Sequence, residues 1–196
     1  MGVFSPGFSS RAHERNPALP PGQYLERDFP VLTAGPTQRI DKRNWSFSVE
    51  TETGETRSWN WQEMLELGPE KVETDIHCVT SWTKLGTSWR GVPLERFLDG
   101  LDTSADYLMA TSYGGYTTNM PFGEIRDRAW LAFEFDGKEL SAEHGGPARL
   151  LVPHLYFWKS AKWVNRLTLM TEDQPGFWER NGYNMHGDPW REERYW

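Results

Sequence analysis

Short stretches in which apolar and polar residues alternate run through the chain. Trp45, Phe47 and Val49 alternate with polar neighbours, which predicts a strand with one buried face. Residues 71–79 alternate in the same way, and they place Cys78 on an apolar face at the end of a second strand. Further strands are predicted over 107–111, 149–152 and 163–170. Most elements of the fold are therefore expected to be short strands.

Aromatic residues contribute strongly to these patterns. In the run 130–135, Trp130, Ala132 and Glu134 are expected to lie opposite Leu131, Phe133 and Phe135, with a hairpin turn at 136–137. The chain holds 11 Trp, 10 Phe and 7 Tyr residues, enough to supply much of a core. Exposed rings could instead stack on a ligand, but most of these rings are expected to pack inside the protein.

Helix signals are fewer. Asn60 is a candidate N-cap with Glu63 reaching back to it, and Gly68 followed by Pro69 predicts the end of that helix. A second, short helix is predicted over 93–98. Because predicted strands outnumber helices, we expect an α+β fold built on a mixed sheet.

The chain is expected to form one domain preceded by an arm. Its 196 residues suffice for one sizeable core and not comfortably for two. Residues 1–36 are rich in proline and are expected to be extended, with the apolar stretch 29–32 docking on the body. The folded domain is then assigned to residues 37–196.

Net charge, hydrophobicity and cysteine content together indicate which partners and which compartment to expect. The chain has 21 Lys and Arg residues against 28 Asp and Glu, a formal net charge of −7, which argues against binding nucleic acid. No apolar stretch approaches the roughly 20 residues of a spanning helix, so no membrane association is expected. We find no export signal and a single cysteine, which together favour a cytoplasmic protein.

The one cysteine is the first candidate for chemistry. On residue type alone, Cys78 would be a buried core residue. It lies, however, in the run Asp-Ile-His-Cys-Val-Thr over 75–80, and two further motifs follow downstream. These are His-Gly-Gly-Pro-Ala-Arg at 144–149 and Trp-Lys-Ser-Ala-Lys-Trp at 158–163.

In this order, the three motifs resemble the oxidoreductase molybdopterin-binding domain of the sulfite oxidase superfamily, especially its short bacterial branch. The resemblance extends over nearly the whole chain, from 20–23 to 187–190. It implies a molybdenum–molybdopterin cofactor that transfers an oxygen atom with two electrons, with Cys78 as a metal ligand. A thiolate suits such a soft, sulfur-rich centre. His77, on the opposite strand face, is interpreted as structural, and the histidine spacings do not favour zinc.

The resemblance also implies the remaining site residues. Positions expected to contact the pterin or its phosphate, or to lie near the metal, are Gly22, Gln23, Thr111, His144, Arg149, Ser160, Ala161 and Lys162. Tyr113 and Tyr116 are both candidates for a catalytic tyrosine beside Cys78. Arg149 and Lys162 supply the positive charge that a phosphate needs in an acidic protein.

The substrate is expected to be a small, weakly charged molecule in preference to sulfite. Sulfite oxidases follow the ligand cysteine with a segment rich in Asn and Arg, whereas residues 79–84 here contain one Lys and no Arg. We therefore favour reduction of an S-oxide or N-oxide. The chain contains no haem domain, so a separate electron donor or acceptor is expected, and a monomer is the default.

Two other classes of function stay open from the sequence. One is a cofactor-free cysteine enzyme, which would need an accessible Cys78 with a lowered pKa. The other is a tryptophan-rich binding module without catalysis, because one fold can host unrelated functions.

Overall fold

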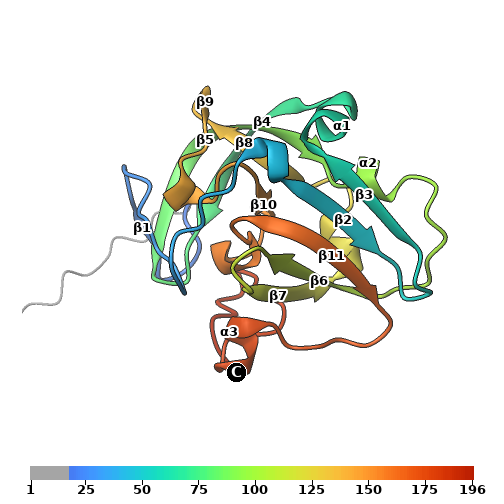
Figure 1. Cartoon of the computed structure of the whole chain (residues 1–196). Coiled ribbons are helices and arrows are strands. Elements are labelled where there is room, and N and C mark those ends of the chain that lie inside the picture. Colours follow the sequence, from blue (N-terminus) through green and yellow to red (C-terminus); the bar gives the residue numbers. More distant parts are fainter. Residues whose placement is uncertain (1–17) are drawn as a thin grey trace, which may run out of the picture.

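Two β-sheets form the body of the protein in a computed structural model that describes residues 18–196 (Figure 1). The first sheet has the strand order β1-β5-β8-β10, with β4 also pairing with β5 and β9 with β8. Its strands are β1 (Tyr24–Leu25), β4 (Glu70–His77), β5 (Trp82–Pro93), β8 (Trp130–Phe135), β9 (Lys138–Glu139) and β10 (Arg149–Leu151). Neighbouring strands are antiparallel except β1 and β5.

The second sheet has the order β3-β2-β11-β6-β7. Its strands are β2 (Ser46–Glu50), β3 (Thr56–Asn60), β6 (Tyr107–Ser112), β7 (Thr117–Pro121) and β11 (Val164–Met170). β2 and β11 run parallel, although more than a hundred positions separate them in the chain, and the other pairs are antiparallel. This confirms the predicted mixed, strand-rich α+β fold.

Helices are short and lie at the margins of the sheets. The α-helices are α1 (Trp61–Glu66), α2 (Glu95–Leu98) and α3 (Phe177–Arg180). Single 3-10 turns occur at η1 (Lys42–Asn44), η2 (Phe122–Ile125), η3 (Ala142–His144) and η4 (Phe157–Lys159). The Asn60 side chain accepts hydrogen bonds from the amides of Gln62 and Glu63, while the Glu63 carboxylate accepts one from the Asn60 amide. The predicted capping box is thus confirmed.

The central strands of the first sheet, β5, β8 and β10, have buried residues on both faces. The larger core lies against the second sheet and contains Trp45, Phe47 and Val49, which confirms the buried face predicted for β2. A second core of aromatic rings, with Trp89 and Phe157 among them, covers the other face of the first sheet. The candidate site lies beside this second core.

Strand β8 departs from the simple alternation expected for it. Leu131 and Phe133 enter the larger core as expected, but Phe135 packs in the second core against Trp89. The pairing of β8 with β5 shifts register between Arg90 and Gly91. Such a bulge reverses the side on which the following residues point, so the expectation that Phe135 shares a face with Phe133 is wrong.

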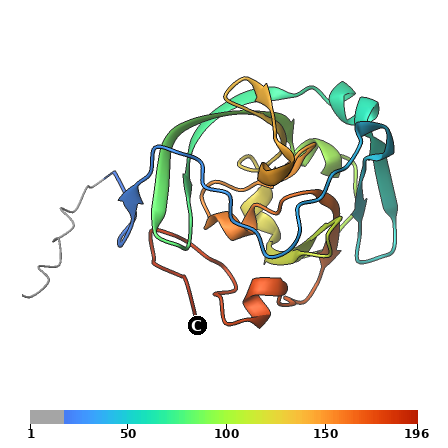
Figure 2. The ribbon, with the colours of Figure 1, turned by 60° about the vertical axis from the view of Figure 1, so that its left-hand side comes forward.

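The arm lies along the body throughout its described part. After β1, the segment coloured blue crosses the whole face of the molecule before it reaches β2 (Figure 2). Phe29 is partly buried in the second core, whereas Val31 and Leu32 stay 50% and 47% exposed, so only part of the docking expected for 29–32 occurs. The predicted domain boundary after residue 36 stays a prediction, and the part of the arm in 1–17 lies outside the described residues.

Among residues 18–196, no helix is long and apolar enough to cross a membrane.

Candidate functional site

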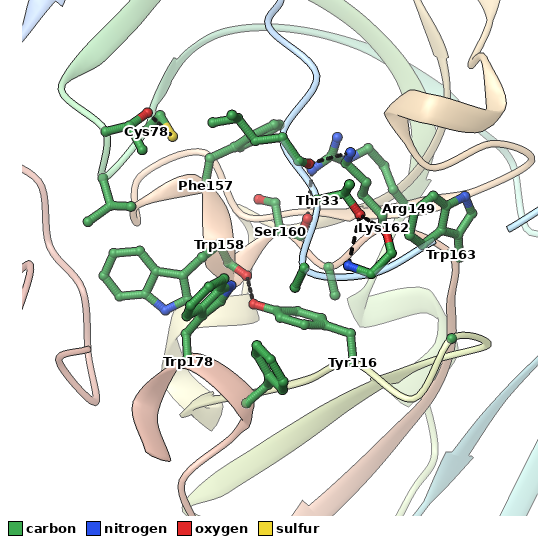
Figure 3. A pocket seen from close by; sticks show the side chains of 18 of the residues that line it. Thr33, Cys78, Tyr116, Arg149, Phe157, Trp158, Ser160, Lys162, Trp163 and Trp178 are labelled. Atoms are coloured by element: carbon green, nitrogen blue, oxygen red, sulfur yellow. Dashed lines mark hydrogen bonds between the residues drawn. The ribbon is translucent and has the colours of Figure 1, made fainter. Parts of the chain in front are cut away.

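A cavity of about 390 Å³ lies between the arm, the turn after β4 and the segment that joins β10 to β11. Figure 3 looks into it, with the sulfur of Cys78 at one end and Lys162, Arg149 and Trp163 at the other. The lining also includes parts of 29–38, 78–82, 114–116, 149–163 and 177–183. Segments from the whole length of the described chain therefore meet here.

Cys78 follows the last residue of β4 and begins a tight turn. The Cys78 amide donates to the Trp82 carbonyl at 2.8 Å, and the Ser81 amide donates to the Cys78 carbonyl at 3.0 Å. Ser81 adopts a left-handed backbone with φ +74°, which closes the turn. Cys78 is 7% exposed, and burial raises the pKa of its thiol. The sulfur is thus held rigidly at one end of the cavity.

Two cations line the opposite end. The Arg149 guanidinium donates to the carbonyls of His144 at 2.9 Å and Ser160 at 2.6 Å. The Lys162 ammonium donates to the carbonyls of Leu32 at 2.6 Å and Glu143 at 2.5 Å. Within the described part of the chain, neither cation forms a salt bridge with a carboxylate.

Burial without a neutralising carboxylate weakens the basicity of both groups. It lowers the pKa of Arg149 from 12.5 to about 9 and that of Lys162 from 10.5 to about 8, and the nearby Arg149 charge adds to the effect on Lys162. Arg149 is 1% exposed and lies over the Phe157 ring. A buried cation of this kind is stabilised when an anion binds beside it.

Gly145 allows the two cationic segments to meet. It has φ +103°, and a Cβ atom there would lie 3.0 Å from the Lys162 Cβ and 3.1 Å from the Arg149 Cβ. A larger residue would therefore push the segments apart. This explains a glycine in the first of the two downstream motifs.

Aromatic side chains build the wall between the two ends. Trp158 contacts Tyr183 with ring centroids 5.0 Å apart, and Tyr183 stacks on Trp178 at 4.9 Å. The Tyr116 hydroxyl donates to the Trp158 carbonyl at 2.7 Å. Burial, and then the negative charge of Glu179, raises the pKa of Tyr116 well above 10.0, so its phenol keeps its proton.

Six of the predicted site residues line the cavity together. These are Cys78, Tyr116, Arg149, Ser160, Ala161 and Lys162. The two tyrosine candidates are thereby separated. The Tyr113 hydroxyl lies away from the cavity lining, where it accepts a hydrogen bond from the Ser46 amide and donates one to the Ser46 carbonyl.

Four other predicted residues lie outside the lining, two of them in the arm and its surroundings. The Gln23 side-chain amide donates to the Cys78 carbonyl at 3.1 Å, so it supports the turn from behind. Gly22 lies in the preceding turn, with Arg194 and Glu192 of the C-terminal segment close by. His144 stacks on Phe29 at 4.0 Å, and Thr111 lies within β6, paired with Thr117.

Sequence reasoning missed a buried ion pair behind the cavity. Lys159 and Glu179 are 0% exposed, and the ammonium lies 2.6 Å from the carboxylate. The same Glu179 oxygen accepts a hydrogen bond from the Trp158 indole at 2.9 Å and thus holds a wall residue in place. The sequence does show a lysine inside the second downstream motif, but no pattern around it identifies Glu179, 20 positions further along, as its partner.

The residues present fit a molybdopterin carrying molybdenum. A soft thiol lies at one end of the cavity, where a metal would need it, and two cations without a carboxylate lie at the other, where a phosphate would need them. Cys78 would hold the metal, while Arg149 and Lys162 would contact the phosphate. The Ser160 carbonyl accepts a hydrogen bond from Arg149 and holds its guanidinium at this end.

Comparisons with known proteins identify the family of the chain. Residues 34–178 match the oxidoreductase molybdopterin-binding domain family. An uncharacterised oxidoreductase, YuiH, of Bacillus subtilis is 35% identical over 190 residues, which cover 95% of this chain and 96% of that protein. Chicken (Gallus gallus) sulfite oxidase is 28% identical, covering 90% of this chain and 41% of its own length.

Two further likenesses concern one more relative in sequence and one solved structure. The protein-methionine-sulfoxide reductase catalytic subunit MsrP of Pseudomonas syringae is 25% identical, covering 83% of this chain and 53% of its own length. The chain thus spans about half the length of these two larger relatives. The crystal structure of the sulfane dehydrogenase SoxCD from Paracoccus pantotrophus matches with a TM-score of 0.64 at 20% identity, covering 74% of this chain and 42% of that one, which shows a shared fold.

The family match extends over all three motifs on which the resemblance rests, the cysteine run at 75–80 and the two downstream motifs. It confirms the expected class of enzyme, an oxidoreductase, and the expected molybdenum–molybdopterin cofactor. The chain belongs to the oxidoreductase molybdopterin-binding domain family of the sulfite oxidase superfamily.

Proposed function

We propose that the protein reduces a small, weakly charged S-oxide or N-oxide by oxygen-atom transfer at a molybdenum centre bound to Cys78. The observation that carries the substrate half is the distribution of charge in the cavity. Of the described residues that line it, only Arg149 and Lys162 carry a positive charge, and both lie at the end away from Cys78. At the sulfur end the cavity lining offers a sulfite dianion aromatic rings and no cation, because Arg194, whose guanidinium donates to the Val79 carbonyl, lies outside the lining.

When bound, the cofactor would supply a metal able to accept an oxygen atom from the substrate while giving it two electrons. Cys78 binds the metal as a thiolate, so its thiol loses a proton when the cofactor binds. Arg149 and Lys162 hold the phosphate and thereby fix the pterin at the far end. Trp158, Trp178 and Tyr183 exclude water and offer apolar surface to the substituents of the substrate.

Tyr116 has a defined part in this site. Its hydroxyl proton is directed at the Trp158 carbonyl, and the raised pKa keeps that proton in place. Tyr116 therefore acts as a neutral wall residue that fixes the Trp158 backbone. Tyr113 has no direct part in this proposal, because its hydrogen bonds with Ser46 tie it to β2.

Electrons are proposed to arrive from a separate donor, with the protein working as a cytoplasmic monomer. The likeness to MsrP, named as a protein-methionine-sulfoxide reductase, supports an S-oxide as the substrate class. The cofactor-free cysteine enzyme is disfavoured, since Cys78 is buried and its pKa is raised rather than lowered.

A competition between the two substrate classes tests the proposal. The molybdenum-loaded protein is assayed for reduction of methionine sulfoxide, dimethyl sulfoxide and trimethylamine N-oxide with a reduced viologen, and for oxidation of sulfite with ferricyanide. We expect a larger kcat/KM for at least one oxide than for sulfite, and loss of both activities in Cys78→Ser. A higher kcat/KM for sulfite would refute the proposed substrate class.

A further inference from the structure

The sulfur of Cys78 accepts a hydrogen bond from the last residue of the cysteine motif, which was assigned no role from the sequence. The Thr80 hydroxyl donates to the Cys78 Sγ atom at 3.1 Å. Thr80 also lines the cavity, and its backbone forms the outer part of the turn that begins at Cys78. The hydroxyl therefore lies beside the one atom of this chain that is proposed to bind the metal.

The backbone of the turn is held from several sides, while the Thr80 side chain itself is exposed. Gln23 donates to the Cys78 carbonyl at 3.1 Å, and the Arg194 guanidinium donates to the Val79 carbonyl at 2.5 Å. The two backbone hydrogen bonds between 78 and 82 complete the support. Because residues from both ends of the described chain fix the turn, the fold sets the backbone positions of Cys78 and Thr80 and so brings the hydroxyl within reach of the sulfur.

A threonine at this position could serve the turn alone, by bonding to its backbone as hydroxyl side chains often do in turns. The geometry is different here. Within the described part of the chain, the Thr80 hydroxyl donates its hydrogen bond to the sulfur of Cys78. This hydrogen bond therefore acts on the electron density of the sulfur that is proposed to bind the metal.

Hydrogen bonds to a ligand sulfur change the properties of the metal that it binds. A donor withdraws electron density from the thiolate and favours the reduced, more electron-rich state of the centre, so it raises the reduction potential. We propose that Thr80 is a positioning residue that tunes the molybdenum centre through the Cys78 sulfur. This inference rests on the proposed function and adds a residue that sets how readily the centre accepts electrons.

Two substitutions separate tuning from turn formation. Thr80→Val keeps the branched shape and removes the donor, whereas Thr80→Ser keeps the donor. In molybdenum-loaded proteins we expect Thr80→Val to lower the Mo(VI/V) potential, measured by an EPR-monitored titration, and to shift the sulfur-to-molybdenum charge-transfer absorption to lower energy. Thr80→Ser is expected to match the wild type in both. Unchanged potential and absorption in Thr80→Val would overturn the inference.

A measurement on the wild type keeps the test valid if Thr80→Val fails to fold or to load metal. Exchange of water for heavy water replaces the hydroxyl proton, and we expect a shift of the Mo–S vibrations in the resonance Raman spectrum. No shift would overturn the role of Thr80 while leaving the molybdenum centre established. A folded wild-type protein that binds no molybdenum would overturn the proposed function and this inference together.

Discussion

Removing the buried charge of Lys159 should destabilise the protein strongly. The ammonium is fully buried, and besides Glu179 it donates to the carbonyls of Asn119 and Met185, each at 2.7 Å. Lys159→Met leaves the Glu179 carboxylate buried with the Thr118 hydroxyl and the Trp158 indole as its remaining donors. An uncompensated buried charge is the expected cause of the loss.

The size of the effect follows from the environment. Breaking a buried pair by removing one partner costs about 3–5 kcal/mol. With a urea dependence of roughly 3 kcal/mol per molar for a chain of this size, the midpoint of unfolding should fall by about 1–1.7 M. Replacing both partners with apolar residues, as in Lys159→Met with Glu179→Leu, should cost less than the sum of the two single changes.

Urea unfolding followed by tryptophan fluorescence measures this loss, and a surface pair supplies the matched control. Arg90 and Glu134 form an ion pair at 3.1 Å with side chains 50% and 25% exposed. Arg90→Met should therefore cost less than about 1 kcal/mol. A loss below 1 kcal/mol for Lys159→Met as well would show that the buried pair contributes no more than the surface pair, and the reasoning would be wrong.

Three smaller predictions concern other residues. Asn60→Ala should lower the free energy of unfolding by about 1 kcal/mol, measured in urea, because two helix amides lose their acceptor; no loss would exclude the cap. In the cofactor-free protein, the pKa of Lys162 is lowered from 10.5 to about 8, so between these pH values Lys162 binds fewer protons in the folded than in the unfolded state. The free energy of unfolding, measured in urea, should therefore rise with pH over this interval, and Lys162→Met should flatten the rise. Hydrogen bonds from Thr103 and Ser104 lower the pKa of Glu52 from 4.5 to about 2, so its contribution is lost as pH falls through that interval. Glu52→Gln should therefore show a smaller difference between the urea midpoints at pH 6 and pH 3.

Features fixed by a few neighbouring residues were predictable from the sequence. The capping box at Asn60 needs only side chains three positions apart, and the buried face of β2 follows from strict alternation. In both patterns, the residues that cause the structure are neighbours in the sequence, and no distant partner takes part.

Features set by distant contacts were not predictable. β5 is the longest strand, yet Gly86 and Gly91 interrupt its pattern, and a close approach to Leu131 explains why glycine is needed at 91. The buried partner of Lys159 comes from α3, and the turn at Cys78 is held by Gln23 and Arg194. None of these contacts produces a periodic pattern of apolar and polar residues in the sequence.

The candidate site was predictable in part for a similar reason. The three motifs located Cys78, Arg149 and Lys162, which line one cavity. They could not distinguish Tyr113 from Tyr116, because the turn between β6 and β7 sends one hydroxyl to Ser46 and the other to the cavity wall. The sequence likewise showed only that aromatic residues are abundant, not which of them form the wall of the cavity.

The central claim is that Cys78 binds a molybdenum–molybdopterin centre in this cavity. The most direct measurement is the molybdenum and pterin content of the protein purified from a host that makes the cofactor, beside Cys78→Ser and with folding checked by circular dichroism. The account predicts about one molybdenum and one pterin per chain in the wild type, and lost or spectroscopically altered molybdenum in the variant. A folded wild-type protein with neither molybdenum nor pterin, or a variant whose metal spectrum is unchanged, would contradict it.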